Sequence, residues 1–99
     1  MLNIEKTRNA SELTVALTGR LDTTTAPVLE KELKASLDGV TSLVIDMTAL
    51  EYISSAGLRV LLTAQKTMNK LGEMKVAHVS ETIMEIFEVT GFCDILTIA

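Results

Sequence analysis

Residues 42–62 read SLVIDMTALEYISSAGLRVLL and contain an apolar run, two adjacent serines and a second apolar run. Residues 42–47 are largely apolar, as is typical of a strand covered on both faces. After the serines, Leu61, Ala64 and Met68 recur at helical spacing, and Gly72 ends the pattern. The stretch therefore predicts a buried strand followed by a helix, with Ser54 and Ser55 at the helix start.

The preceding part of the chain predicts two strands and a helix. In residues 13–19, LTVALTG, apolar and polar side chains alternate as in a half-buried strand. Residues 2–7 are a shorter candidate strand that would complete a hairpin. Pro27 suits the first turn of a helix in which leucines recur every fourth residue, with Gly39 as its left-handed C-terminal cap.

The part that follows predicts one more strand and one more helix. Residues 74–79, MKVAHV, resemble a short buried strand, Ser80 is placed to cap a helix, and Gly91 ends it. Residues 95–99 are a candidate for a last strand. This order predicts a single α/β domain over residues 1–99, a mixed β-sheet of four to five strands with helices packed on it.

Composition narrows the class of protein. The chain has 99 residues and a net charge of −4, with a pI near 4.9, and lacks the basic footprint that nucleic-acid binding needs. Cys93 is the only cysteine, so no disulfide forms within the chain, and we expect its thiol to be buried. The first residues do not resemble a signal peptide, and no run approaches 18 apolar residues, so we expect a cytoplasmic protein without membrane insertion.

Helix capping explains one of the two serines but does not explain Gly57. Serine is among the best helix N-caps, worth about 1 kcal/mol over alanine, so one of the pair is expected to cap the helix. Gly57 in the first turn costs roughly 0.8–1 kcal/mol relative to alanine. Either something approaches its backbone closely, or strand and helix pack tightly there.

Catalysis fits the sequence poorly. The nucleophile elbow requires a glycine two residues before the serine, and Ile53 stands there before Ser55. The only histidine, His78, lies in the apolar VAHV and is expected to be a core or edge residue. The phosphate-binding loop motif and metal-ligand spacings are absent, and Asp22 and Asp46 are isolated acids. The sequence thus predicts no enzyme, cofactor or metal, and favours a serine that is itself the substrate of another enzyme.

Two motifs of the chain are familiar: GRLDTTTAP, residues 19–27, and YISSAGL, residues 52–58. They resemble the STAS domain, the fold of bacterial anti-sigma factor antagonists, and the likeness extends over nearly the whole chain. The resemblance implies an antagonist that captures an anti-sigma factor serine kinase and releases a sigma factor. Phosphorylation of the antagonist would end the capture, and a PP2C-type phosphatase would restore it.

The resemblance also implies a set of site residues. The phosphorylated position falls on Ser55, with Ser54 where the family often has an acid and Ala56 where it often has a second serine, so Ser54 is the alternative acceptor. Asp22 matches a loop acid that shapes the kinase contact. The residues themselves add two more candidates. Gly57 beside the serine would let the kinase approach, and the helical spacing of Arg59, Thr63, Lys66 and Lys70 predicts a basic stripe that is either a partner surface or a solvated helix face.

Other uses of the same fold remain open at this point. The chain could be a subunit of a signalling complex, a partner of a lipid-transport ATPase, or a domain that binds a small ligand near the second helix. The departures at Ser54 and Ala56 do not decide among these alternatives.

Overall fold

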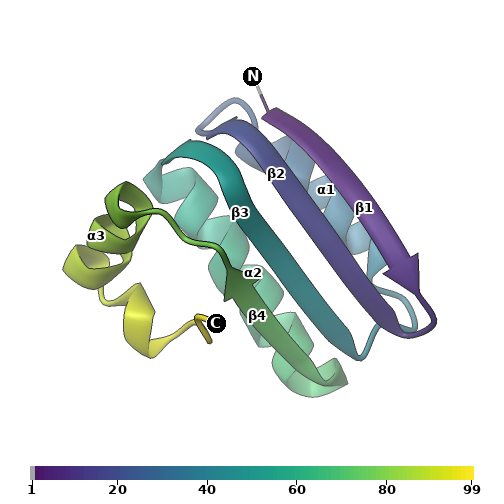
Figure 1. Ribbon diagram of the computed structural model, residues 1–99. Helices are drawn as coiled ribbons and strands as arrows, with labels where there is room; N and C mark the ends of the chain where they lie inside the picture. The colour runs from purple at the N-terminus through teal and green to yellow at the C-terminus, as the bar shows by residue number, and fades with distance from the viewer. Residues whose placement is uncertain (1) are drawn as a thin grey trace.

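The computed structural model describes residues 2–99, which form four strands, three α-helices and one short 3₁₀ helix (Figure 1). Their bounds are β1 (Leu2–Asn9), β2 (Glu12–Leu21), α1 (Ala26–Ser36), β3 (Ser42–Ile53), α2 (Ser55–Leu71), β4 (Glu73–Ala77), α3 (Glu81–Thr90) and η1 (Phe92–Asp94). The predicted order of strands and helices is confirmed.

The sheet has the spatial order β1-β2-β3-β4. β1 and β2 form the predicted antiparallel hairpin, turning at Ala10, which has a φ of 56°. β2, β3 and β4 are parallel neighbours, so α1 and α2 are the crossover connections between them. The predicted fold class, a mixed sheet with helices packed on it, is therefore confirmed.

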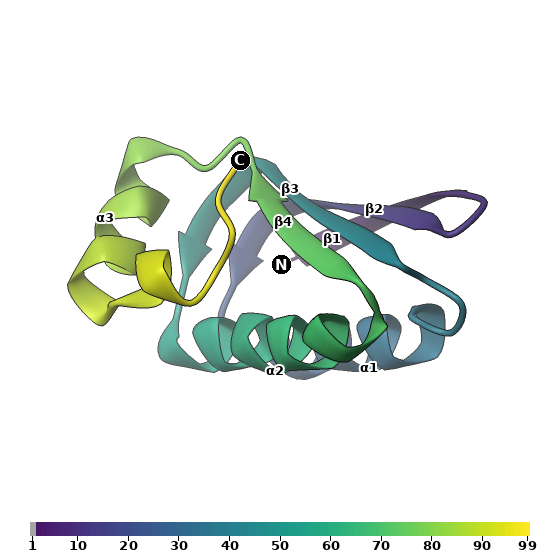
Figure 2. The ribbon, with the colours of Figure 1, turned by 90° about the horizontal axis from the view of Figure 1, so that it is seen from below.

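Both crossover helices lie side by side on one face of the sheet (Figure 2). Alternate strand residues on that face, such as Val15, Ile45 and Val76, are fully buried and belong to one continuous apolar core. On the opposite face Val44 and Asp46 are only half-buried. The prediction that residues 42–47 are covered on both faces is wrong, because among residues 2–99 no helix crosses that second face of β1 to β3 (Figure 1).

The last part of the chain folds beside the sheet. Ser80 caps α3, accepting a 3.3 Å hydrogen bond from the Ile83 N–H, and Gly91 ends the helix with a φ of 80°, both as predicted. The candidate last strand forms only an isolated bridge, in which Ile98 pairs in parallel with Val76. Within the described chain, no helix combines the length and apolar character that crossing a bilayer requires.

Two local predictions are wrong, those for Gly39 and Cys93. Gly39 does have a φ of 77°, but α1 ends at Ser36, so Gly39 lies in the turn before β3 and not at the helix cap. His78, predicted as a core or edge residue, is exposed and follows the edge strand β4 directly, with a φ of 57°. Cys93 is exposed in η1, where its Sγ lies 3.8 Å from Sδ of Met84, because the segment after α3 crosses the surface.

Candidate partner-binding site at the start of α2

The two serines occupy different positions at the start of α2. Ser54 is the N-cap, with extended backbone, and its Oγ accepts a hydrogen bond from the Gly57 N–H at 3.4 Å. Its carbonyl oxygen accepts the first helical bond, from the Leu58 N–H at 2.9 Å. The prediction that one serine caps the helix is therefore confirmed for Ser54.

Ser55 is the first residue of α2, and its side chain is exposed. Within residues 2–99, no side-chain hydrogen bond occupies its hydroxyl group. At this position the hydroxyl lies beside the free N–H groups and the positive end of a helix 17 residues long. An anion attached to Ser55 would meet a favourable electrostatic field.

A backbone contact brings the loop of Asp22 to this helix start. The Ser54 N–H donates a 2.9 Å hydrogen bond to the carbonyl oxygen of Leu21, and Leu21 pairs with Ile53 across the parallel strands. Both loops therefore leave the sheet at the carboxyl ends of adjacent strands, which is where binding sites of α/β proteins gather. Asp22 and Ser55, predicted as site residues from separate motifs, belong to the same edge.

Asp22 orders its own loop. Its Oδ1 accepts hydrogen bonds from the Thr24 hydroxyl at 2.8 Å, the Thr24 N–H at 3.0 Å and the Thr25 N–H at 3.1 Å. The Thr24 hydroxyl contributes most to lowering the pKa of this carboxyl below its usual value, and the backbone donors of Thr25 and Thr24 act in the same direction. These bonds hold the Asp22 side chain against its own loop and favour its charged form, so the loop presents a carboxylate.

Gly57 serves the interior of the domain. The residue is buried, and a Cβ placed on it would lie 2.7 Å from Cγ of Leu21 and 2.9 Å from Cγ1 of Ile53. Tight packing of helix on strand, one of the two explanations that the sequence left open, accounts for the glycine. The position where a Cβ would lie faces the core and not the surface. The predicted role of Gly57 in the approach of a kinase therefore has no support in its position.

Ala56 and Arg59 line a groove between α1 and the beginning of α2. The hollow measures about 560 Å³, and Ala26, Pro27 and Val60 contribute apolar surface to it. A second hollow of about 180 Å³ shares Val60 with it and extends between the helices past Leu33 and Ala64. A continuous groove therefore leads away from the helix start that carries Ser55.

The sequence predicted only part of the lining of this groove. The predicted basic stripe of Arg59, Thr63, Lys66 and Lys70 is exposed on α2, as expected, and its first two residues line the groove. Lys31 and Lys34 of α1, which line the hollow opposite Arg59, were missed. They belong to another helical segment, and nothing in the local pattern indicates that α1 and α2 are neighbours.

An aromatic contact near the helix start was also missed. The Arg20 guanidinium carbon lies 4.4 Å from the centre of the Tyr52 ring, and the two residues are paired on β2 and β3. Such a contact holds an exposed arginine in place over a ring. Cross-strand pairing could have identified it, had the register been known.

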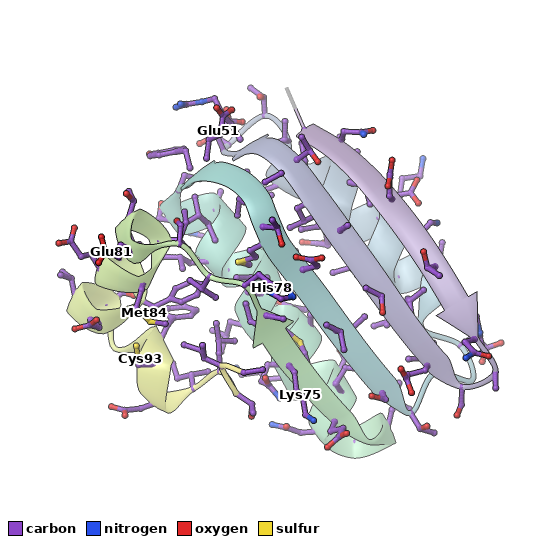
Figure 3. All side chains as sticks on the ribbon, viewed as in Figure 1. Glu51, Lys75, His78, Glu81, Met84 and Cys93 are labelled. Atoms are coloured by element: carbon purple, nitrogen blue, oxygen red, sulfur yellow. The ribbon has the colours of Figure 1, made fainter. Side chains whose placement is uncertain are left out.

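The geometry does not support a serine hydrolase. β3 and β4 pair as far as Asp46 and Ala77, and β3 then continues for seven residues before Ser54. At about 3.3 Å per residue, His78 is thus roughly 20 Å from Ser55. In Figure 3, His78 lies beside the middle of β3, whereas Glu51 lies at the end of that strand. Across the described chain, no three His, Cys, Asp or Glu side chains form a group that could hold a metal ion.

Comparison with known proteins identifies relatives along the whole chain. BtrV of Bordetella bronchiseptica, which carries the name of an anti-sigma factor antagonist, is 38% identical over 89 residues, covering 88% of this chain and 77% of that protein. The anti-sigma-B factor antagonist of Bacillus subtilis is 29% identical over 99 residues, covering 99% and 91%.

Solved structures share the fold. An anti-sigma factor antagonist from Mycobacterium paratuberculosis superposes with a TM-score of 0.89 at 24% identity, covering 99% of this chain and 85% of that one. SpoIIAA of Bacillus, in its phosphorylated form, superposes with a TM-score of 0.75 at 17% identity, covering 100% and 91%. The STAS domain model matches residues 2–99, and with the sequence relatives this shows that the chain belongs to the STAS domain family.

Proposed function

We propose that this protein is an anti-sigma factor antagonist, which binds an anti-sigma factor and so releases a sigma factor for transcription. The names of its relatives, among them the anti-sigma-B factor antagonist of Bacillus subtilis, support this role. The proposal includes the cytoplasmic location expected from the sequence, because a sigma factor acts there. In this role the chain is a substrate and a binding partner, without an enzymatic activity of its own.

The observation that carries the proposal is the exposed Ser55 hydroxyl at the start of α2. It lies one residue beyond the cap, on the same edge of the sheet as the ordered Asp22 carboxylate. A kinase can reach such a hydroxyl without unfolding the helix, because the capping bond belongs to Ser54. We infer that the anti-sigma factor is a serine kinase, that Ser55 is its phosphorylation site, and that a PP2C-type phosphatase removes the phosphate.

Phosphorylation would switch binding without changing the fold. A phosphate adds about −1.5 to −2 charges and three acceptor oxygens, and a helix N-terminus favours an anion. Its effect must then fall on the partner, through repulsion, steric block and desolvation of a surface that was neutral at Ser55. SpoIIAA, which shares the fold, has been solved in both an unphosphorylated and a phosphorylated form, and this supports a fold that tolerates the modification.

The test is phosphosite mapping after incubation with ATP and the cognate anti-sigma factor. Wild type, Ser54→Ala and Ser55→Ala are compared by intact mass, and binding to the anti-sigma factor is measured before and after phosphorylation. We expect one phosphate in wild type and Ser54→Ala, none in Ser55→Ala, and weaker binding of the phosphorylated form. The switch at Ser55 would be overturned by a phosphate that persists in Ser55→Ala, or by unchanged binding after phosphorylation. No binding of the unmodified protein would overturn the antagonist role itself.

A further inference from the structure

The charge of this chain is divided unevenly between its helical layer and the rest. α1 and α2 carry five of the nine basic residues and two of the thirteen acidic ones, so their net charge is +3 and that of the remainder is −7. One of the two acids, Glu32, is neutralised by Lys6 of β1, with Nζ and Oε2 2.6 Å apart. The surface formed by α1 and α2 is thus positive on a protein that is acidic overall.

The groove concentrates this charge around an apolar floor. Lys31, Lys34 and Arg59 line its wide end, against the single acid Glu30, which lies 3.2 Å from Lys34. Ala26 and Val60 there, and Leu33 and Ala64 farther along, are buried apolar residues that line the two hollows. A ligand that fits must therefore offer apolar groups toward the floor and anionic groups toward the rim.

We propose that the groove between α1 and α2 is the docking site for an acidic amphipathic helix of the anti-sigma factor. This inference rests on the proposed function and names the chemistry of the partner's contact. A helix is the segment expected to pack between two helices, because its side-chain rows fit such a groove and its backbone groups are already hydrogen-bonded. Its carboxylates would pair with Lys31, Lys34 and Arg59, which are opposite in sign to most of this protein's surface.

The same geometry supplies a way for Ser55 to control docking. Ala56, the next residue, lines the wide end of the groove, so a phosphate on Ser55 would add negative charge at its mouth. Arg59 lies four residues after Ser55, the spacing at which side chains on a helix meet. The phosphate would therefore repel the acidic helix and at the same time draw the Arg59 guanidinium away from it.

The test compares charge reversals on the two sides of the sheet. Lys31→Glu and Arg59→Glu change the groove, and Lys75→Glu makes the same change in charge at an exposed position of β4, outside the groove. Affinity for the unphosphorylated anti-sigma factor is measured by calorimetry at low and high salt, with thermal unfolding as a check on the fold. We expect the groove variants to bind about tenfold more weakly, Lys75→Glu to change affinity less than about twofold, and only wild type and Lys75→Glu to lose affinity steeply with salt.

The outcomes separate this inference from the function on which it rests. Wild-type affinity in both groove variants would overturn the docking site and leave the antagonist role intact. A loss in Lys75→Glu as large as in the groove variants would overturn it as well, by placing the contact on the sheet. If wild type itself does not bind the anti-sigma factor, both the proposed function and the docking site are overturned.

Discussion

The backbone N–H of Ser54 donates a 2.9 Å hydrogen bond to the carbonyl oxygen of Leu21. This bond joins the last residue of β2 to the cap of α2, across a pair of parallel strands. Because Asp22 follows Leu21 and Ser55 follows Ser54, the loop acid and the exposed serine are fixed to one edge by the backbone alone. The relative placement of these two residues therefore does not depend on their own side chains.

Replacing Gly57 by alanine should destabilise the domain. The new Cβ would lie 2.7 Å from Cγ of Leu21 and 2.9 Å from Cγ1 of Ile53, both fully or nearly fully buried. Overpacking of this kind costs about 1–3 kcal/mol, against a gain of about 0.8–1 kcal/mol in helix propensity. We expect a net loss in the free energy of unfolding, measured by urea denaturation, and a thermal midpoint lower by about 4–8 °C for each kcal/mol lost.

Two further variants show whether the clash is the cause. Ser55→Ala, at the exposed neighbouring position, should stay within about 0.5 kcal/mol of wild type. In Gly57→Ala/Leu21→Ala, where the contacted side chain is removed, the total loss should be smaller than the sum of the single losses. Gly57→Ala at wild-type stability would instead mean that the helix shifts freely on the sheet.

Ser54→Ala should weaken the fold where Ser55→Ala does not. Ser54 Oγ accepts the Gly57 N–H, and loss of such a cap costs about 0.5–2 kcal/mol; the 3.4 Å length of this bond places the expected cost near the lower limit. Ser54→Asp retains an acceptor and should restore most of the loss. Equal stability of Ser54→Ala and Ser55→Ala in thermal unfolding would contradict the assignment of Ser54 as the cap.

Hydrophobic periodicity, together with residues that begin or end helices, predicted the order of strands and helices, because both signals are local in the sequence. Pro27, Ser80 and Gly91 mark helix ends through their own backbone chemistry, and all three lie where this chemistry predicts. The length of β3 was not predictable in this way. After Met47 its buried residues are Leu50 and Ile53, three apart, because the pairing with β2 shifts register and the period of two is lost.

Other features depend on which segments meet, and a local pattern does not contain that information. Lys31 and Arg59 share a groove only because α1 and α2 are adjacent on one face of the sheet. Cys93 was expected to be buried from its apolar character, yet the path of the chain after α3 leaves it exposed. The extent of the domain over residues 1–99 stays a prediction.

The ionisation of Asp22 should depend on Thr24. The Thr24 hydroxyl is the largest cause of the lowered pKa of Asp22, so Thr24→Ala should move this pKa up toward its ordinary value, as followed by carboxyl ¹³C NMR titration. Because the folded pKa lies below the unfolded value of about 4, Asp22 adds stability above that pH and loses it as the pH falls through the folded pKa. The acid-induced loss of stability should therefore be smaller in Thr24→Ala.

Asp46 supplies a matched control, since Thr48 lowers its pKa by the same arrangement, with a 2.6 Å bond from the Thr48 hydroxyl. Thr24→Ala should leave the pKa of Asp46 unchanged, and Thr48→Ala should leave the pKa of Asp22 unchanged. If Thr24→Ala leaves the pKa of Asp22 where it is, the hydroxyl bond is not what orders the loop, and the backbone donors alone hold the carboxylate.

Cys93 should react with a thiol reagent in the folded protein. Its side chain is exposed in η1, and its Sγ lies 3.8 Å from Sδ of Met84. We expect one equivalent of maleimide to add in native buffer, read by intact mass, with none added to Cys93→Ser and with the circular dichroism spectrum unchanged. Labelling that requires denaturant would show that the segment after α3 covers the thiol, as its apolar character first suggested, and would place the chain end differently against β4.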